Sequence, residues 1–138
     1  METGNTVTRV EHIGIAVRSL ADAIPLYENL LGTRCYAVEE VPDQAVKTAF
    51  FRVGETKIEL LESTSPDGPV ARFVLKRGEG IHHIALAVAD VNSALTSLNE
   101  LGIKAIDTAP RPGAEGMSIA FLHPGSTGGV LLELCAKS

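Results

Sequence analysis

The sequence predicts an α+β fold in which one strand and helix module occurs twice. Three observations predict it: an internal repeat, apolar residues that alternate along short segments, and helical stripes of apolar residues behind the first strand of each copy. The chain has 138 residues, of which 45% are hydrophobic, and this suits one compact domain with a substantial core. We expect helices on one face of curved, mostly antiparallel sheets.

The internal repeat is the strongest of these observations. Four short segments recur in the same order at nearly one spacing: 11–17 on 82–88, 19–20 on 90–91, 49–51 on 120–122 and 58–60 on 132–134. Four matches in one order are hard to obtain by chance. We therefore predict a single domain, residues 1–138, made of two repeats, 7–62 and 81–136, which are joined by a linker over 63–80.

The strands are predicted from alternation. Over 10–17, a histidine and small residues alternate with large aliphatic residues, and the same pattern recurs around His83. Because the aliphatic face can pack on a helix, the opposite face leaves room above each histidine. Further strands are predicted near 46–53, 56–62, 117–122 and 129–136.

A helix follows the first strand of each repeat. Asp90 is a suitable N-cap for the second helix, which glycine ends at Gly102. The first helix ends at Gly32 and contains Pro25, which costs about 3 kcal/mol in a helix interior. We therefore expect this helix to begin near Ala21 and to keep the proline in its first turn. The linker suits a short helix ended by glycine.

Composition and missing motifs exclude several functions. A net charge of −5 and an aromatic content of 4% argue against nucleic acid as a partner. No apolar run is long enough to cross a membrane and the N-terminus has no signal-peptide pattern, so we expect a cytoplasmic protein. Cys35 and Cys135 form no CxxC pair, which excludes a thiolate zinc site. GxSxG, P-loop and dinucleotide fingerprints are absent.

Four polar residues stand at matching places on the predicted apolar strands: His12, Glu59, His83 and Glu133. Burial of a carboxylate is costly unless the group is paired or binds a metal. Any one of the four is more often a structural residue, but duplication brings equivalent residues to a shared axis or to symmetric places about it. Two imidazoles and two carboxylates suit a divalent transition metal, which would keep two adjacent positions for a bidentate oxygen substrate.

Other polar residues rank lower as functional candidates. His82, His123 and Cys135 are predicted to be structural. The segment 111–116 is rich in turn residues and is either a substrate lid or a connection. Four basic residues, Lys76, Arg77, Lys104 and Arg111, could meet phosphates, although scattered basic residues are normally only solvated.

The four residues and their flanks resemble the vicinal oxygen chelate, or glyoxalase, superfamily and, within it, the methylmalonyl-CoA epimerases. The resemblance covers almost the whole chain and is carried by VEHIGIAV at 10–17, VPDQAVK at 41–47, TKIELLE at 56–62, GIHHIA at 80–85, FLHP at 121–124 and GGVLLEL at 128–134. It implies the vicinal oxygen chelate fold, in which two tandem βαβββ modules form a curved sheet around a metal site.

The resemblance also implies an activity. The chain would be an isomerase that interconverts (R)- and (S)-methylmalonyl-CoA by α-proton abstraction through a metal-stabilised enolate. The implied metal ligands are His12, Glu59, His83 and Glu133. Co²⁺ is the expected ion, with Zn²⁺, Ni²⁺ or Mn²⁺ as alternatives.

Two departures from the family pattern bear on the chemistry. Some relatives carry an acid where Thr48 stands, and many carry lysine where Gly125 stands. Threonine cannot serve as the base, so Glu59 and Glu133 become the expected acid–base pair. The missing lysine removes one contact to a substrate phosphate.

The chain has few expected partners, and two alternative functions stay open. We expect an acyl-CoA substrate, no membrane partner and a homodimer. A glyoxalase I-like lactoylglutathione lyase would use the same four ligands on a glutathione adduct. A binding module of the same fold would hold a small molecule without metal or catalysis.

Overall fold

The computed structural model describes residues 6–138 and divides the chain into two compact units. One unit is His12–His82, and the other is His83–Ser138 together with the N-terminal segment that ends at Glu11. Each unit has its own strands and core, with helices α1 and α2 in the unit His12–His82 and α3 in the other.

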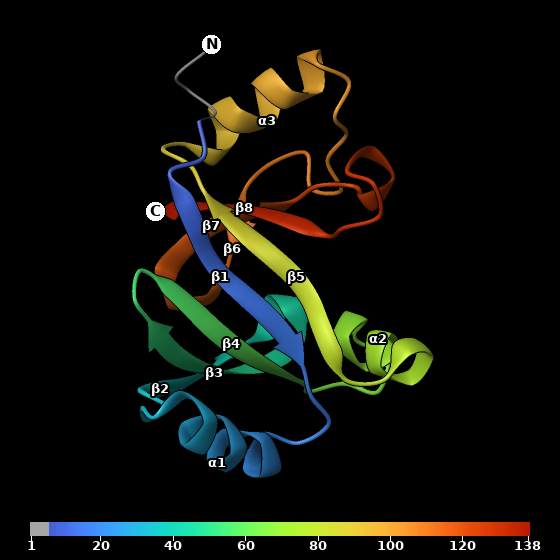
Figure 1. Cartoon of the computed structure of the whole chain (residues 1–138). Helices are drawn as coiled ribbons and strands as arrows, with labels where there is room; N and C mark the ends of the chain where they lie inside the picture. The colour runs from blue at the N-terminus through green and yellow to red at the C-terminus, as the bar shows by residue number, and fades with distance from the viewer. Residues whose placement is uncertain (1–5) are drawn as a thin grey trace. The chain divides into compact units, whose positions relative to one another are not determined.

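The unit His12–His82 holds β2, β3, β4 and the part of β1 that begins at His12, in the order β2-β3-β4-β1. β1 runs parallel to β4, whereas β3 is antiparallel to β2 and β4. Helix α1 packs on β3 and β4 around the fully buried Phe51 and Leu60 (Figure 1). The bounds are β1 Arg9–Ala16, α1 Leu20–Leu31, β2 Ala37–Val41, β3 Val46–Val53, β4 Thr56–Ser63 and α2 Pro69–Arg77.

The second unit holds the part of β5 that begins at His83, with β8, β7 and β6, in the order β5-β8-β7-β6. β5 runs parallel to β8, and β7 is antiparallel to β8 and β6. Helix α3 covers β7 and β8 through a core that includes Ala94, Ala120 and Leu134 (Figure 1). The bounds are β5 Gly80–Ala87, α3 Val91–Glu100, β6 Arg111–Pro112, β7 Met117–Phe121 and β8 Leu132–Lys137.

These elements confirm the predicted α+β class and the succession of strand, helix and strands in both halves. The linker helix α2 forms and is capped by Gly78. Strands β2 and β6 are the strands that the βαβββ modules imply but that alternation did not locate, and β8 begins at Leu132 rather than near 129. Gly128 and Gly129 have φ of 70° and 94°, which keeps them in the preceding turn. The arrangement of 7–62 and 81–136 as repeats of one domain stays a prediction.

Helix α1 corrects the expectation about Pro25. The helix begins at Leu20, and the side chain of Ser19 accepts a hydrogen bond from the Asp22 N–H at 3.3 Å. Pro25 therefore lies inside the helix rather than in its first turn. Because proline has no N–H, the carbonyl of Ala21 loses the partner that an ordinary residue would supply. The N-cap at Ser19 decides the start, since it satisfies a backbone donor of the first turn.

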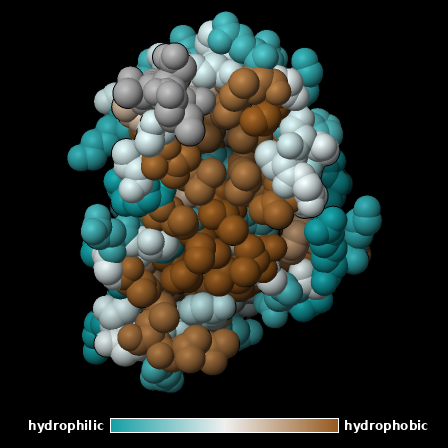
Figure 2. Space-filling view, turned by 45° about the horizontal axis from the view of Figure 1, so that its top comes forward, coloured by the Kyte–Doolittle hydropathy of each residue, from teal (hydrophilic) through white to brown (hydrophobic). Residues whose placement is uncertain are grey.

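Each unit leaves large aliphatic residues of its first strand half covered: Ile13 and Ile15 in one unit, Ile84 and Leu86 in the other. Figure 2 shows apolar residues gathered on one face of the molecule and hydrophilic residues around them. An apolar area of this kind is typical of a surface that a partner covers. Within residues 6–138, no helix has the length and hydropathy needed to span a membrane.

Candidate functional site

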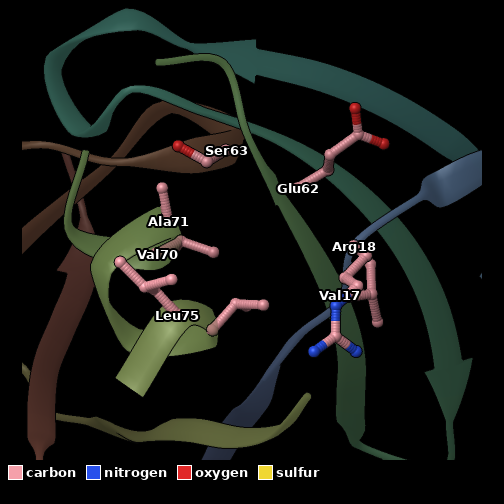
Figure 3. Close-up of a pocket in the computed structure, with 8 residues that line it drawn as sticks. Val17, Arg18, Glu62, Ser63, Val70, Ala71 and Leu75 are labelled. Atoms are coloured by element: carbon pink, nitrogen blue, oxygen red, sulfur yellow. The ribbon is translucent and has the colours of Figure 1, made fainter. Parts of the chain in front are cut away.

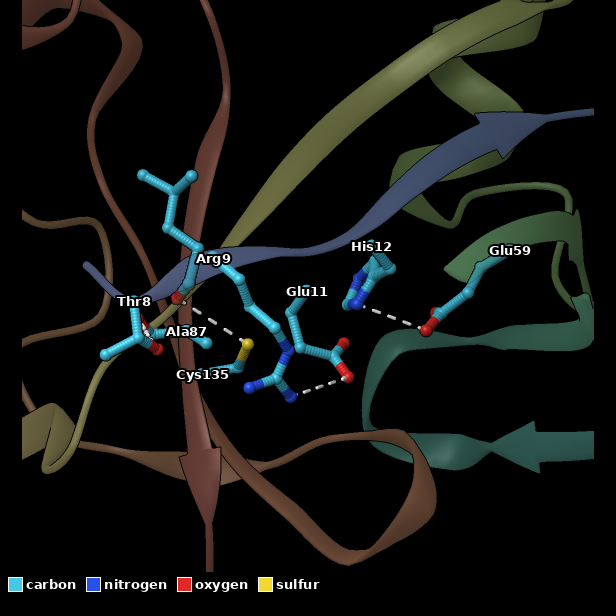
Figure 4. A network of polar contacts seen from close by, with 8 residues as sticks. Thr8, Arg9, Glu11, His12, Glu59, Ala87 and Cys135 are labelled. Carbon is cyan, nitrogen blue, oxygen red and sulfur yellow. Dashed lines mark hydrogen bonds and ion pairs between the residues drawn. The ribbon is translucent and has the colours of Figure 1, made fainter. Parts of the chain in front are cut away.

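His12 and Glu59 form a buried pair in the unit His12–His82. His12 comes from β1 and Glu59 from the parallel neighbour β4, where Glu59 lies beside Gly14. The imidazole Nδ1 lies 3.1 Å from the carboxylate Oε2, and Figure 4 shows the two side chains pointing toward each other. Only 6% of His12 and 4% of Glu59 is exposed. Gly14, the register partner of Glu59, has no side chain that could crowd this pair.

His83 and Glu133 form the corresponding pair in the second unit. His83 comes from β5 and Glu133 from the parallel neighbour β8, where Glu133 lies beside Ala85. The imidazole Nε2 lies 2.9 Å from the carboxylate Oε1, and each residue is 4% exposed. The Phe121 ring meets the His83 ring edge-on, with centroids 5.4 Å apart and an angle of 85°. This contact holds the imidazole plane in place.

The two pairs occupy equivalent positions of their sheets. In each unit the glutamate has a register partner on either side. On the parallel strand the partner is the residue two positions after the histidine. On the antiparallel strand it is a phenylalanine, Phe50 for Glu59 and Phe121 for Glu133. The ring nitrogens differ, since His12 meets its carboxylate through Nδ1 and His83 through Nε2. The duplication therefore extends from the sequence to the strand register, but not to the orientation of the rings.

The donor set of these pairs fits a divalent transition metal. Imidazole nitrogen and carboxylate oxygen are the ligands that such ions accept. Histidines that bind a metal through one nitrogen commonly donate the other N–H to a carboxylate, which fixes the ring. His12, His83 and Glu133 are potential metal ligands on these grounds. Without an ion, the short contacts within each pair offset part of the cost of burial.

The remaining predicted candidates have contacts that fit structural roles. His123 accepts a hydrogen bond on Nδ1 from the Gly125 N–H at 3.0 Å and so closes a turn. The His82 ring lies 5.0 Å from the Phe73 ring, and the Cys135 Sγ lies 3.6 Å from the carbonyl oxygen of Leu86.

Thr48 lies on the same sheet face as Glu59. It stands opposite Leu61 in the register of β3 and β4, and Leu61 is two residues beyond Glu59 on one strand. Thr48 is 1% exposed. Its hydroxyl cannot take the part of a carboxylate base, as the sequence indicates.

Two basic residues lie on the sheet faces that carry the pairs. Sequence analysis did not identify Lys57 as a candidate and ranked Arg111 low. Lys57 is 7% exposed and pairs in register with His12, on the face of β4 that also carries Glu59. Its position two residues before Glu59 was the signal that could have found it. Arg111 stands opposite Ile119 in the short strand β6. No local pattern marks that strand, because it consists of Arg111 and Pro112 alone.

A separate cavity lies in the unit His12–His82 beside helix α2. Its volume is about 380 Å³, and it contains none of the four predicted metal ligands. Val17 lines this cavity. It is five residues after His12 in an extended segment, so its side chain points to the opposite, helix-covered face of the sheet. Figure 3 shows the α2 side chains Val70 and Leu75 on one side of this space and Arg18 and Glu62 on the other. The cavity is therefore not part of the candidate metal site.

Comparisons with known proteins agree with this geometry. Residues 11–121 match the family described as the glyoxalase/bleomycin resistance protein/dioxygenase superfamily. The ethylmalonyl-CoA/methylmalonyl-CoA epimerase of Cereibacter sphaeroides is 38% identical over 130 residues, which are 93% of this chain and 97% of that protein. The mitochondrial methylmalonyl-CoA epimerase of Homo sapiens is 37% identical over 127 residues, which are 91% of this chain and 72% of that protein.

Solved structures agree as well. A methylmalonyl-CoA epimerase in complex with methylmalonyl-CoA and NH4+ matches this chain with a TM-score of 0.92 and 34% identity, and the match covers 96% of both chains. The predicted vicinal oxygen chelate fold and the predicted resemblance are thereby confirmed.

Proposed function

Because the chain belongs to the glyoxalase/bleomycin resistance protein/dioxygenase superfamily and, within it, to the methylmalonyl-CoA epimerases, we propose that it interconverts (R)- and (S)-methylmalonyl-CoA. The chain is therefore an enzyme of the isomerase class. The observation that carries the proposal is the presence of two buried imidazole–carboxylate pairs at equivalent register positions, His12 with Glu59 and His83 with Glu133.

The proposal includes one divalent ion held by both pairs. The two pairs supply two imidazoles and two carboxylates, all of them buried. This donor set suits Co²⁺, with Zn²⁺, Ni²⁺ or Mn²⁺ as alternatives. When bound, such an ion supplies Lewis-acid stabilisation of the negative charge that develops on the thioester oxygen. The chain's own carboxylates must supply the proton transfers.

Glu59 and Glu133 are the proposed acid–base pair. One carboxylate takes the α-proton, and the electron pair of the broken C–H bond enters the enolate. The other group, in its protonated form, returns a proton to the opposite face of the same carbon, which inverts the centre. Support for this assignment comes from the equivalence of the two glutamates and from Thr48, whose buried hydroxyl leaves that position without a base.

Proton exchange in heavy water tests the proposed function. Cobalt-loaded protein is mixed with methylmalonyl-CoA in deuterium oxide, and the C2 proton signal is followed by NMR. We expect loss of that signal, since the α-proton passes to a carboxylate that exchanges with solvent. A signal that decays no faster than in the metal-only control contradicts the proposal.

The same samples decide between the epimerase and its rivals. Turnover of a glutathione hemithioacetal without exchange of methylmalonyl-CoA would support a lactoylglutathione lyase. Stoichiometric ligand binding by metal-free protein, without exchange, would support a binding module.

A homodimer is also part of the proposal. In each unit the half-covered aliphatic residues of the first strand, Ile13 and Ile15 in one and Ile84 and Leu86 in the other, leave apolar surface that a second chain would cover. Sedimentation equilibrium should return twice the chain mass of 14.6 kDa. A single-chain mass at micromolar concentration would contradict the dimer. The cytoplasmic location stays a prediction.

A further inference from the structure

Arg111 lies on the face of its sheet that carries the His83–Glu133 pair. It stands opposite Ile119 on β7, and Ile119 stands opposite Cys135 on β8. Partners in register share a face, and Cys135 is two residues beyond Glu133 on the same strand. The guanidinium therefore belongs to the same surface as the pair, one row of residues along the strands.

Contacts on two sides hold the Arg111 side chain. Its Nε lies 3.2 Å from Asp107 Oδ1, which makes the two side chains an ion pair. Asp107 is itself fixed, because its Oδ2 accepts a hydrogen bond from the Phe121 N–H at 2.8 Å. The guanidinium carbon lies 5.8 Å from the centre of the Phe121 ring. The same ring is the one that meets His83.

This arrangement presents an oriented cation beside the pair. The Arg111 side chain is 32% exposed and Asp107 is 17% exposed, so the guanidinium is only partly hydrated. Arginine carries five N–H donors in a planar fork, and Asp107 lies beside the Nε of that fork. That fork matches the two oxygens of a carboxylate or a phosphate.

We propose that Arg111 binds an anionic oxygen group of the acyl-CoA substrate and so sets substrate affinity. The inference rests on the proposed function, because it concerns the substrate of that site. The substrate offers two sources of this chemistry, the carboxylate on its α-carbon and the phosphates of CoA. Asp107 is a positioning residue, since it orients the guanidinium.

The chain offers a matched control in Arg77. Its guanidinium carbon lies 5.7 Å from the centre of the Phe73 ring, which is nearly the same cation–π geometry. Arg77 is an exposed residue in the last turn of α2, outside the strands that carry the pairs. A general effect of removing an arginine from a ring should therefore appear in both variants.

Steady-state kinetics of Arg111→Met, Arg111→Lys and Arg77→Met test the inference. Each variant is assayed by C2 proton exchange with methylmalonyl-CoA and with its N-acetylcysteamine thioester, which has no phosphate. We expect Arg111→Met to raise KM for methylmalonyl-CoA at least about tenfold, with a smaller change in kcat. Arg111→Lys should fall between this variant and wild type, because it keeps the charge but loses the fork. Arg77→Met should stay within about twofold of wild type.

The truncated thioester separates the two sources. A KM effect that persists with it supports a contact to the carboxylate, and one that disappears supports a contact to a phosphate. An unchanged KM with both substrates overturns the inference. Thermal unfolding of each variant excludes a loss of fold, and if Arg111→Met does not fold, the KM of Arg111→Lys decides the question.

Direct binding separates this inference from the proposed function. If wild-type protein catalyses no exchange, the function fails, and calorimetric titration with methylmalonyl-CoA then tests Arg111 alone. A Kd that rises at least about tenfold in Arg111→Met supports the residue's role as an anion-binding group. A Kd within about twofold of wild type, or no binding by wild type, overturns it.

Discussion

At the scale of single residues, the four candidate site residues are costly to bury and are placed so that part of that cost is offset. Each histidine lies within 3.1 Å of a carboxylate oxygen, and none of the four is more than 6% exposed. Small neighbours make this possible, since Gly14 and Ala85 stand beside the glutamates in register. Each apolar sheet thus holds a buried imidazole and a buried carboxylate in contact with each other.

The two glutamates should contribute unequally to exchange from the two stereoisomers. In the proposed reaction each carboxylate works on one face of the α-carbon, so Glu133→Gln should slow exchange from one isomer by about 10²- to 10⁴-fold and from the other much less. Glu59→Gln should show the opposite preference. Initial rates of deuterium incorporation from pure (R)- and (S)-substrate measure both effects.

Metal content must be measured on the same samples. A glutamine variant that retains the ion and exchanges both isomers at the wild-type rate would remove that residue from the proposed mechanism.

At the scale of elements, helix α1 carries an unfavourable residue that the site does not require. Pro25 is exposed and lies in the helix interior, where it removes a backbone donor. Pro25→Ala should therefore raise the free energy of unfolding, by up to about 3 kcal/mol, because alanine restores the hydrogen bond to the Ala21 carbonyl. Urea denaturation of both proteins measures the difference.

Leu30→Ala, in the same helix at a position that is 70% exposed, is a suitable control. Its unfolding free energy should stay close to that of wild type. A Pro25→Ala variant no more stable than wild type would mean that the helix accommodates proline without the expected cost.

Helix α3 begins with a titratable cap. The hydroxyl of Ser93 donates a hydrogen bond to Asp90 at 2.7 Å and lowers the pKa of that carboxyl below its ordinary value, and the Asn92 N–H adds to the effect. A lowered folded-state pKa means that the stabilisation is present above the unfolded pKa and is lost as pH falls through the folded pKa.

Asp90→Asn keeps a capping oxygen but does not titrate. The stability advantage of wild type over Asp90→Asn should therefore shrink as pH falls from about 6 to about 2. Thermal unfolding across this range measures it. An advantage that is the same at every pH would exclude Asp90 as the titrating cap.

At the scale of the whole molecule, much of the fold and the candidate site could be predicted because they are repeated. A histidine and a glutamate recur on matching apolar strands, and strand alternation alone places them on one face of each sheet. The helices and most strands followed from apolar stripes, caps and glycines.

The rest depends on contacts that no local pattern records. β6 is a two-residue strand that exists only through its pairing with β7, so the position of Arg111 was not visible in the sequence. His12 meets its carboxylate through Nδ1 and His83 through Nε2, a difference that the repeated sequence does not show. The low helix propensity of proline did not keep Pro25 in the first turn, since the N-cap at Ser19 decided where the helix begins.

The central claim is that both repeats supply ligands to one metal-dependent site, and the stoichiometry of cobalt binding tests it most directly. Metal-free protein is titrated with Co²⁺ by calorimetry, with visible absorption recorded in parallel, for wild type, His12→Ala and His83→Ala. We predict one equivalent of Co²⁺ per chain, and we predict that either substitution abolishes it, because a single ion needs ligands from both pairs. Two equivalents per chain, each lost only when its own histidine is replaced, would contradict the claim.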